Sequence, residues 1–330
     1  MLNVSIIGLG YWGPNYLRIF NELPQSKVRY CCDLDSNNLI KIKKEYPNVK
    51  TTQDYEKVAK DSNTDAVIIA TPLNTHYTIA KCCLEHKKHV LAEKPFTSTY
   101  LEGKKLIKLA EKNSLVLMVG HVYKYNPGIK KLKELMESGK LGNVYYIREE
   151  RIGLGPIRKY ASALWDLATH DISIALYLTN SFPTEIVAQG EFYLQKNIED
   201  LVFLTLKFPK NIMCTIYATW IAPEKIRKIT IVGSKAMAIF DDTNKQKMIQ
   251  VYERELDSKL INSTPKYSDH QNIINIGKVY IPEVERSEPL KNQAQHFLEC
   301  ILEQKKPITS GEDGISVVKV LNLAEKSLKD

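Results

Sequence analysis

The feature that most constrains the fold lies almost at the start of the chain, where a short apolar segment runs into a glycine-rich turn. Asn3–Gly8 reads as a buried strand, and Gly8, Gly10 and Gly13 form a G-x-G-x-x-G pattern. The segment after them begins with Pro14, which a helix tolerates in its first turn because the backbone N–H that proline lacks has no partner there. A strand, a tight turn and a helix in this order are typical of the first unit of a doubly wound α/β sheet.

Each glycine of this turn has a separate physical task. Gly8 allows the tight turn, Gly10 lets the backbone approach a pyrophosphate, and Gly13 lets the helix pack on the strand. The pyrophosphate would lie at the helix N-terminus, where free N–H groups and the helix dipole favour an anion. The alternative is a purely structural turn.

An acidic residue at the end of the second strand decides between these alternatives. Asp33 lies there, in "VRYCCDLD", twenty positions after Gly13. A carboxylate at this point accepts hydrogen bonds from the adenosine ribose and repels a 2′-phosphate. The sequence therefore predicts a dinucleotide site that takes NAD rather than NADP. Asp35 is a second candidate for the same ribose, and a merely exposed Asp33 is the structural alternative.

The first 120 residues alternate between strand and helix patterns. Several strands are continuously apolar, as "AVIIAT" shows, which is how strands buried on both faces of a parallel sheet read. The expected strands are Asn3–Gly8, Lys27–Asp33, Ala66–Thr71, His89–Ala92 and Leu115–Gly120. The expected helices are Pro14–Glu22, Ser36–Tyr46, Thr75–His86 and Ser98–Asn113. We therefore expect an α/β fold that begins with a Rossmann, doubly wound parallel sheet.

The pattern changes near His121, after which strands follow one another with short turns such as "FPKN" and "GSK". This order predicts a second domain with an antiparallel or mixed sheet and helices on one face. The expected strands are Val144–Arg151, Glu185–Leu194, Leu201–Phe208, Ile212–Ile221, Ile226–Val232, Ala236–Asp241 and Lys247–Glu253. The expected helices are Pro127–Ser138, Trp165–Leu178, Leu290–Glu303 and Gly311–Leu328, and Leu256–Ser287 is expected to be a long loop. We place an NAD-binding domain at residues 1–120 and a substrate-binding and oligomerisation domain at 121–330.

Composition excludes several classes of protein. A chain of 330 residues with 44% hydrophobic and 25% charged residues is an ordinary globular protein of two domains. No apolar run approaches the roughly 20 residues of a membrane-spanning helix, and the first strand leaves no room for a signal peptide. We expect a cytoplasmic protein with no membrane partner. The net charge of +8 is spread over helices with interleaved acids, which argues against a nucleic-acid groove.

The six cysteines include no C-x-x-C pair. Their spacing suits neither a zinc site nor a disulfide scaffold, so we expect reduced and mostly buried thiols and no metal.

Three further clusters of polar residues are candidates for the ligand-binding and catalytic groups of a fold of this kind. "ATPLNTH" follows the third expected strand, so that Thr71 and His76 reach the ligand crevice, unless the segment is only a helix start capped by Asn74 or Thr75. "AEKP" ends the fourth strand, and Lys94 in it is a candidate donor to a substrate hydroxyl. Its structural alternative is a surface lysine in a turn.

The third cluster is "WDLATHD". Asp166 and His170 are four positions apart and share one helix face. A histidine beside a carboxylate is a usable general base near neutral pH, which the oxidation of a carbinol requires. A structural His–Asp pair is the alternative, and Asp171 faces a different direction.

Through these motifs, the chain resembles the glucose–fructose oxidoreductase / inositol dehydrogenase / MocA family over essentially its whole length. The resemblance rests on "GLGYWG", "CDLD", "ATPLNTH", "AEKPF", "VGHVYKYNP" and "LWDLATHDI" in the family's order. It implies a C-terminal α/β domain with an open, mostly antiparallel sheet, which commonly forms a homodimer or homotetramer interface.

The resemblance also implies roles for individual residues. Lys94 matches the lysine that binds substrate and assists proton transfer, His170 matches the catalytic acid/base, and Asp166 matches its substrate-binding partner. The residues expected at the NAD cofactor are Gly8, Gly10, Tyr11, Trp12, Gly13, Asp33, Thr71, Pro72, His76, Glu93 and Lys94. The candidate substrate contacts are Tyr123, Asn126, Arg158, Tyr160 and Trp165. Many relatives carry Arg at the position of Lys124, so a role borrowed for that position is in doubt.

The expected activity is NAD-dependent hydride transfer on a sugar. "GLGPIRKY", at Gly153–Tyr160, resembles a segment of members that handle nucleotide-linked sugars, which favours oxidation or reduction at a ring position such as C3. A free inositol, polyol or aldose is the alternative substrate. A non-catalytic NAD-binding sensor is a third possibility, but such a protein has no need of Lys94 and His170.

Overall fold

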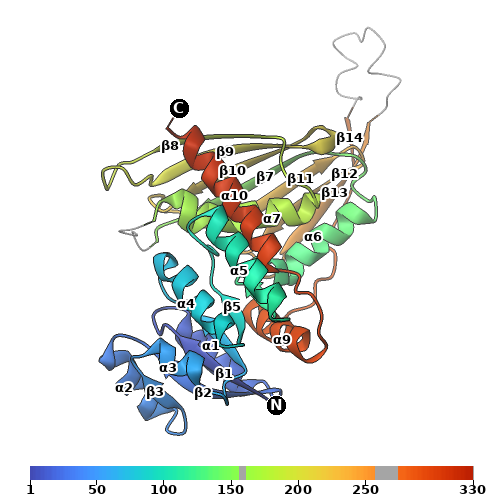
Figure 1. Ribbon diagram of the computed structural model, residues 1–330. Helices are drawn as coiled ribbons and strands as arrows, with labels where there is room; N and C mark the ends of the chain where they lie inside the picture. Colours follow the sequence, from blue (N-terminus) through green and yellow to red (C-terminus); the bar gives the residue numbers. More distant parts are fainter. Residues whose placement is uncertain (156–160, 257–273, 330) are drawn as a thin grey trace, which may run out of the picture. The chain divides into compact units, whose positions relative to one another are not determined.

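The computed structural model describes residues 1–155, 161–256 and 274–329, and the chain divides into two compact units (Figure 1). The first unit contains Met1–Tyr125 and Ser287–Asn322, and the second contains Asn126–Arg286 and Leu323–Asp330. Residues from the C-terminal part of the chain thus complete the unit that holds the glycine-rich turn.

The first unit is built on a six-stranded parallel sheet of order β3-β2-β1-β4-β5-β6. Its strands are β1 Leu2–Ile7, β2 Ser26–Cys32, β3 Lys50–Thr52, β4 Ala66–Ile69, β5 His89–Ala92 and β6 Leu117–Val119. This order confirms the predicted doubly wound sheet, in which strand order reverses at β1. Strand β3 and the helix α3 (Tyr55–Lys60) after it were not predicted, because a three-residue polar strand at a sheet edge leaves no apolar pattern.

The helices of this unit agree with the expected segments to within a few residues. Besides α3, they are α1 Gly13–Glu22, α2 Ser36–Glu45, α4 Leu73–Glu85, α5 Tyr100–Lys112, α9 Pro289–Leu302 and the greater part of α10 Gly311–Ser327, whose residues from Leu323 on belong to the second unit. Pro14 lies in the first turn of α1, as predicted. The start of α5 is fixed by a capping box, in which Thr99 and Glu102 each bind the backbone N–H of the other.

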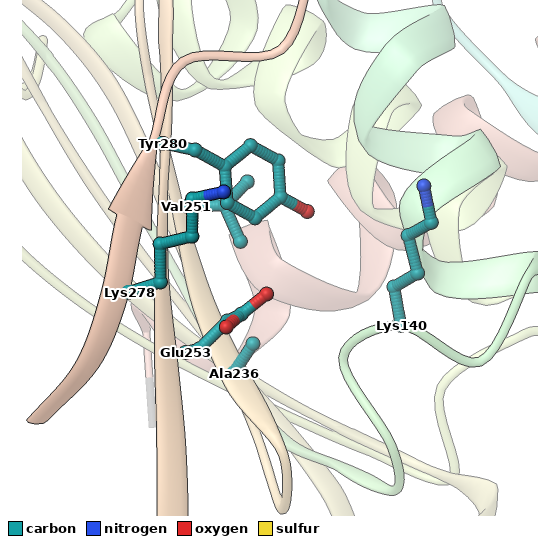
Figure 2. A pocket seen from close by; sticks show the side chains of 6 residues that line it. All are labelled: Lys140, Ala236, Val251, Glu253, Lys278 and Tyr280. Carbon is teal, nitrogen blue, oxygen red and sulfur yellow. The ribbon is translucent and has the colours of Figure 1, made fainter.

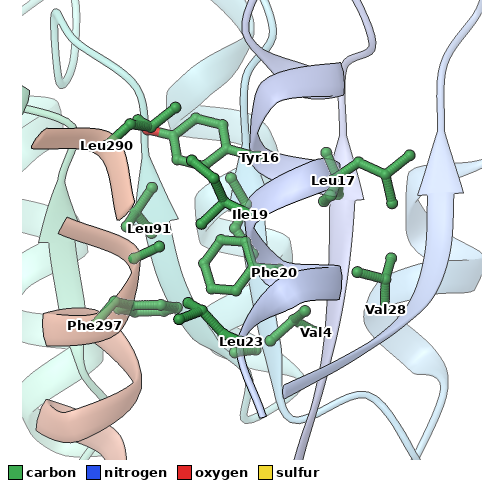
Figure 3. Packing of buried hydrophobic residues seen from close by; sticks show 14 of the residues in the cluster. Val4, Tyr16, Leu17, Ile19, Phe20, Leu23, Val28, Leu91, Leu290 and Phe297 are labelled. Atoms are coloured by element: carbon green, nitrogen blue, oxygen red, sulfur yellow. The ribbon is translucent and has the colours of Figure 1, made fainter. Parts of the chain in front are cut away.

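The core of the first unit joins α1 to α9 across more than two hundred residues of sequence. Tyr16, Phe20 and Phe297 are fully buried, and Figure 3 shows them packed between the two helices beside Leu290. Burying each such side chain contributes about 1.5–3 kcal/mol. This contact explains why α9 belongs to the first unit.

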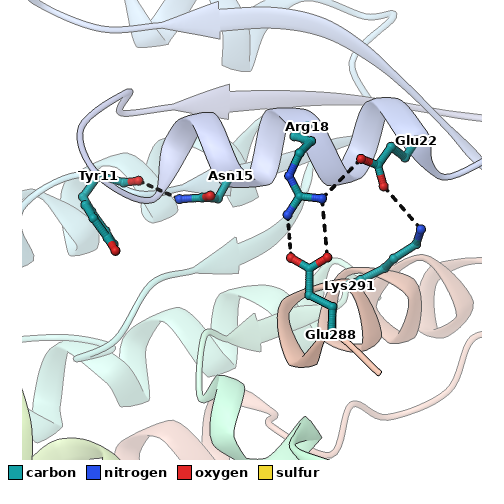
Figure 4. A network of polar contacts seen from close by, with 6 residues as sticks. All are labelled: Tyr11, Asn15, Arg18, Glu22, Glu288 and Lys291. Carbon is teal, nitrogen blue, oxygen red and sulfur yellow. Dashed lines mark hydrogen bonds and ion pairs between the residues drawn. The ribbon is translucent and has the colours of Figure 1, made fainter. Parts of the chain in front are cut away.

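Polar side chains at the surface also join α1 to α9 (Figure 4). Arg18 pairs with Glu288 at 2.5 Å and with Glu22 at 3.2 Å, and Lys291 lies 3.3 Å from Glu22. These side chains are about two-fifths exposed, so the pairs orient the helices more than they stabilise them.

The second unit contains an eight-stranded sheet of order β14-β13-β12-β11-β7-β10-β9-β8. Its strands are β7 Val144–Ile152, β8 Glu185–Glu191, β9 Leu201–Phe208, β10 Ile212–Thr219, β11 Ile226–Gly233, β12 Ala236–Asp241, β13 Ile249–Leu256 and β14 Ile274–Tyr280. Only β7 and β10 pair in parallel, so the described sheet is mixed and mostly antiparallel, as predicted.

The expected loop at Leu256–Ser287 is wrong in part, because β14 lies within it. This strand lies at the edge of the sheet, where β13 is its one partner among the described strands, and it contains Gly277, so its sequence carries little alternation. Residues 257–273 of the same stretch lie outside the described residues.

Helices cover one face of this sheet, in agreement with the prediction. They are α6 Pro127–Glu137 and α7 Thr169–Thr179, which packs on β7 and β10. Along β7, Ile147, Glu149 and Arg151 are buried, whereas Tyr146 and Arg148 are exposed. The alternation leaves the other face of the sheet without a covering layer among the residues that the structure describes.

The cysteines and the hydropathy of the helices bear on two expectations from composition. All six cysteines are free thiols and five are buried, as expected, and burial raises the pKa of Cys31 to about 12. Among the residues that the structure describes, no helix has the length and hydropathy needed to cross a membrane.

Candidate active site

The glycine-rich turn between β1 and α1 has room for a ligand only at its middle glycine. A Cβ at Gly8, whose φ is +93°, would lie 2.5 Å from the carbonyl oxygen of Ala70, and a Cβ at Gly13 would lie 2.0 Å from that of Gly8. A Cβ at Gly10 would meet nothing within 4 Å. The outer glycines are therefore required by packing, and the open position at Gly10 fits the approach of a pyrophosphate.

Asp33 is fixed beside this turn. Its Oδ2 accepts a hydrogen bond of 2.6 Å from the backbone N–H of Leu9, and its Oδ1 accepts one of 2.8 Å from that of Asp35. Asp35 itself caps α2 by accepting from the N–H of Asn37. The carboxylate of Asp33 thus lies at the carboxyl end of β2, next to the glycine turn, where an adenosine ribose binds in this fold. Tyr11 is exposed and Trp12 half-buried at the same turn.

The Thr71–His76 segment connects β4 to β5 through one histidine. His76 is buried, and its ring nitrogens lie 2.8 Å from the carbonyl oxygen of Thr71 and 2.9 Å from that of Pro95. Burial lowers the pKa of His76, so the ring is neutral near pH 7. A neutral imidazole has a single N–H, so it donates to only one of these two carbonyl oxygens at a time, and both oxygens lie just after a strand of the sheet. The N-cap of α4 is Pro72, not Asn74 or Thr75, so the alternative that either of these residues caps the helix is wrong.

The "AEKP" motif lies at the end of β5, with a cis peptide bond between Lys94 and Pro95. Glu93 is buried beneath it: Oε1 accepts a 2.6 Å hydrogen bond from the Tyr16 hydroxyl, and Oε2 accepts one of 3.0 Å from the backbone N–H of Lys94. Burial raises the pKa of Glu93, while Tyr16 and Lys94 oppose that rise. The side chain of Lys94 is half-buried at the edge of the sheet that also carries the glycine turn.

His121, which was not a predicted site residue, follows β6 at the same edge of the sheet. Its side chain is 1% exposed, and within the described residues neither ring nitrogen has a hydrogen-bond partner. Burial, Lys124 and Lys94 together hold the pKa of His121 well below its usual range. Lys124 is buried as well and forms an ion pair with Asp313 of α10. The one feature of the sequence that could have indicated this histidine is the "GH" that precedes "VYKYNP".

The "WDLATHD" cluster belongs to the second unit. Leu164–Ala168 forms a π-helical turn that leads directly into α7, so Asp166 lies in the wider turn and His170 in the first turn of α7. Insertions of this kind occur often at functional sites. Trp165, Asp166 and His170 are all half-buried.

Asp171 next to them is structural, as its predicted direction implied. It is buried, and both of its carboxylate oxygens accept hydrogen bonds, of 2.8 and 2.9 Å, from Nε of Arg151 on β7. This pair fixes the start of α7 against the sheet. Burial and the neighbouring Asp171 hold the pKa of Glu149 well above its usual range.

The candidate substrate contacts are distributed over both units. Tyr123 belongs to the first unit, whereas Asn126 and Trp165 belong to the second. Asn126 caps α6 by accepting from the N–H of Gly128 at 2.8 Å, and its amide donates to Asp242. Arg158 and Tyr160 lie outside the described residues.

A pocket of about 360 Å³ lies elsewhere in the second unit, along β12, β13 and β14 (Figure 2). It is lined by Lys140, Ala236, Val251, Glu253, Lys278 and Tyr280. None of these is a predicted site residue. The described residues contain no cluster of histidine, cysteine and acidic side chains that fits a metal ion.

Comparison with known proteins places this geometry in a family. Residues 2–121 match a family model described as an oxidoreductase family with an NAD-binding Rossmann fold, and residues 129–239 match a GFO/IDH/MocA C-terminal domain. The two matches together cover more than half of the chain. They define an oxidoreductase with an NAD(P)-binding Rossmann domain. The chain belongs to the GFO/IDH/MocA family, as its motifs indicated.

Individual relatives differ in the substrate that their names give. Myo-inositol 2-dehydrogenase of Thermotoga maritima is 24% identical over 100% of this chain and 97% of its own length. UDP-N-acetylglucosamine 3-dehydrogenase of Acidithiobacillus ferrooxidans is 28% identical over 58% of this chain and 59% of its own. A solved structure of the latter enzyme covers 99% of this chain and 98% of its own, with a TM-score of 0.84 at 20% identity, which shows a shared fold.

Proposed function

We propose that this protein is an NAD-dependent oxidoreductase that acts on a ring hydroxyl or keto group of a nucleotide-activated sugar. The observation that carries this proposal is the position of Lys94. It ends β5, its backbone is held by Glu93, and it shares the ligand-binding edge of the sheet with the glycine turn and Asp33.

In the proposed mechanism, the residues of this chain bind and orient the cofactor and the sugar, and they transfer one proton. NAD supplies the hydride acceptor when it is bound. Lys94 donates a hydrogen bond to the oxygen of the reacting carbon and polarises it. His170 takes the hydroxyl proton during oxidation and returns it during reduction, and Asp166 orients the sugar or the imidazole. The first unit holds the cofactor, and the second holds the substrate and the oligomer interface.

The preference for NAD over NADP rests on Asp33. A carboxylate held at 2.6 Å from the N–H of Leu9 has no freedom to move away from the ribose. A 2′-phosphate at this position would meet a fixed negative charge, whereas two ribose hydroxyls would find an acceptor.

Two observations favour a nucleotide sugar over a free polyol. A named relative acts on UDP-N-acetylglucosamine, and the net charge of +8 suits the attraction of a diphosphate. The second candidate is an inositol or another free polyol, which the full-length match to an inositol dehydrogenase supports.

The test is the change in NADH absorbance when the protein and NAD are mixed with a panel of UDP- and TDP-sugars, myo-inositol and glucose. We expect turnover of a nucleotide sugar and a loss of about 10²–10⁴-fold in kcat/KM for Lys94→Ala, since proton-transfer groups contribute that much. Lys105→Ala, an exposed lysine of α5, is the matched control. Turnover of inositol alone would sink the nucleotide-sugar proposal, and an active Lys94→Ala variant would sink the role of Lys94.

A further inference from the structure

A chain of buried hydrogen bonds reaches the backbone of Lys94 from the other end of the sequence. The side-chain amide of Gln293, on α9, donates to the Tyr16 hydroxyl at 2.9 Å. Tyr16, on α1, donates to Oε1 of Glu93 at 2.6 Å, and Oε2 of Glu93 accepts from the N–H of Lys94 at 3.0 Å. Tyr16 and Gln293 are 0% exposed, and Glu93 is 7% exposed.

The order of donors in this chain is fixed by chemistry. A tyrosine hydroxyl has one hydrogen, and Tyr16 uses it on the carboxylate. Its oxygen then accepts, so Gln293 must present its NH₂ group and not its carbonyl. Each donor therefore fixes the next acceptor, and the Tyr16 hydroxyl and the Lys94 N–H both donate to the carboxylate of Glu93.

The charges around this chain indicate that Tyr16 and Gln293 do more than fill space in the core. Lys94 lies at the end of this chain, and its positive charge lowers the pKa of the Glu93 carboxyl against the effect of burial. Burial raises the pKa of Glu93, so a carboxylate there depends on donors such as the Tyr16 hydroxyl. Without that donor, the carboxyl group loses one of the two contacts that fix its plane.

We propose that Tyr16 and Gln293 are positioning residues for Lys94, which act by holding the Glu93 carboxylate against the Lys94 backbone. The assignment rests on the proposed function for the role of Lys94 itself. It gives α1 two tasks, because the helix that begins at the glycine turn also carries Tyr16. It also explains why α9 has a buried glutamine in an otherwise apolar contact face.

The first experiment measures amide hydrogen exchange at Lys94 by NMR on lysine-labelled protein, without substrate or cofactor. Tyr16→Phe removes only the hydroxyl, and Gln293→Met keeps the shape of the side chain but removes its amide. We expect exchange at Lys94 to rise about 10-fold in Tyr16→Phe, and less in Gln293→Met, because a buried hydrogen bond to a charged group is lost or weakened.

The matched control is Tyr125→Phe. Tyr125 is also a buried tyrosine of the first unit, and its hydroxyl lies 3.2 Å from Oγ1 of Thr309 instead of Glu93. We expect no change at Lys94 in this variant. Equal exchange at Lys94 in the parent and both test variants, or an equal rise in Tyr125→Phe, would overturn the proposal. If Tyr16→Phe does not fold, the exchange rate at Lys94 in Gln293→Met decides whether the proposal stands.

A second readout separates this proposal from the proposed function. On the sugar that the parent oxidises, Tyr16→Phe should lower kcat about 10-fold with little change in KM, since the lysine is misplaced and not removed. An unchanged kcat would overturn the positioning role. If no sugar of the panel is oxidised, the proposed function fails while the exchange experiment still decides the link between Tyr16 and Lys94.

Discussion

At the scale of single residues, the proposed cofactor site depends on one carboxylate, that of Asp33, which has two roles. Asp33 supports the glycine turn through the N–H of Leu9, and it faces the position expected for the adenosine ribose. A substitution at this residue therefore disturbs both the turn and the choice of cofactor. The neighbouring Asp35 is engaged in capping α2, so the two acidic residues can be told apart by experiment.

Replacing Asp33 with asparagine should weaken NADH binding by about 10-fold or more, because hydrogen bonds to a charged group contribute about 1.5–3 kcal/mol. The preference for NADH over NADPH should shrink at the same time, since the fixed negative charge is removed. Fluorescence titration with both cofactors measures the two effects. Asp35→Asn should leave the preference unchanged, and a change of preference in that variant would assign the ribose to Asp35 instead.

At the scale of elements, different glycines of the turn between β1 and α1 serve packing and ligand binding. A methyl group at Gly10 would enter open space, whereas one at Gly13 would lie 2.0 Å from the carbonyl oxygen of Gly8. The same substitution should therefore leave the stability unchanged at Gly10 and lower it at Gly13.

We expect Gly10→Ala to unfold at the parent's denaturant midpoint but to bind NADH about 10-fold more weakly, because its methyl group occupies the approach of the pyrophosphate. Gly13→Ala should be destabilised by about 1–3 kcal/mol or more, since the helix must move away from the strand. Chemical denaturation and cofactor titration of both variants check this. Normal NADH binding by Gly10→Ala would show that the pyrophosphate lies elsewhere.

A second element-scale prediction concerns the pair that ties β2 to the segment before β4. The Arg29 guanidinium, 2.5 Å from Oδ2 of Asp61, lowers the pKa of that carboxyl to about 2. A carboxyl whose pKa is depressed on folding stabilises the fold above its unfolded pKa and loses that contribution as the pH falls through the folded value. Asp61→Asn should therefore be less stable than the parent at pH 7, and the difference should vanish between about pH 4 and pH 2. Denaturation midpoints measured across this range test it, and a difference independent of pH would contradict the assignment to the ion pair.

At the scale of the whole molecule, the exposed face of the eight-stranded sheet carries apolar side chains that require an explanation. Val187, Phe203, Met213 and Tyr146 on this sheet are 43–50% exposed, and Phe203 stacks on Tyr217 with ring centroids 4.7 Å apart. Exposed apolar side chains on neighbouring strands are typical of an interface. We propose that a second copy of the chain covers this face in a homodimer or homotetramer.

Phe203→Glu should convert that oligomer to monomers, because a charge in the middle of an apolar contact is costly to bury. Size-exclusion chromatography with light scattering gives the mass of the parent and the variant. Leu101→Glu is a control of the same chemistry, since Leu101 is 68% exposed on α5 in the other unit. A monomeric parent would contradict the proposed interface.

Much of this protein could be predicted from local patterns, since those patterns are direct consequences of local physics. The glycine turn, the apolar strands of the parallel sheet and the hairpins of the second unit were all predicted and found. The misses were β3, α3 and β14, which are short or lie at an edge, so that few of their side chains are forced into a core. His121 was missed because its burial depends on elements distant in sequence.

By itself, the sequence determined most of the strands and helices and their order, the glycine turn with Asp33, and membership of a family of oxidoreductases, because all of these depend on residue type and spacing along the chain. The tertiary structure alone decided that α9 packs on α1, that Gln293 and Tyr16 hold Glu93, and that Asp171 pairs with Arg151. Gln293 and Tyr16 are 277 positions apart. Such contacts form only when distant segments pack together, and no local period or motif specifies them.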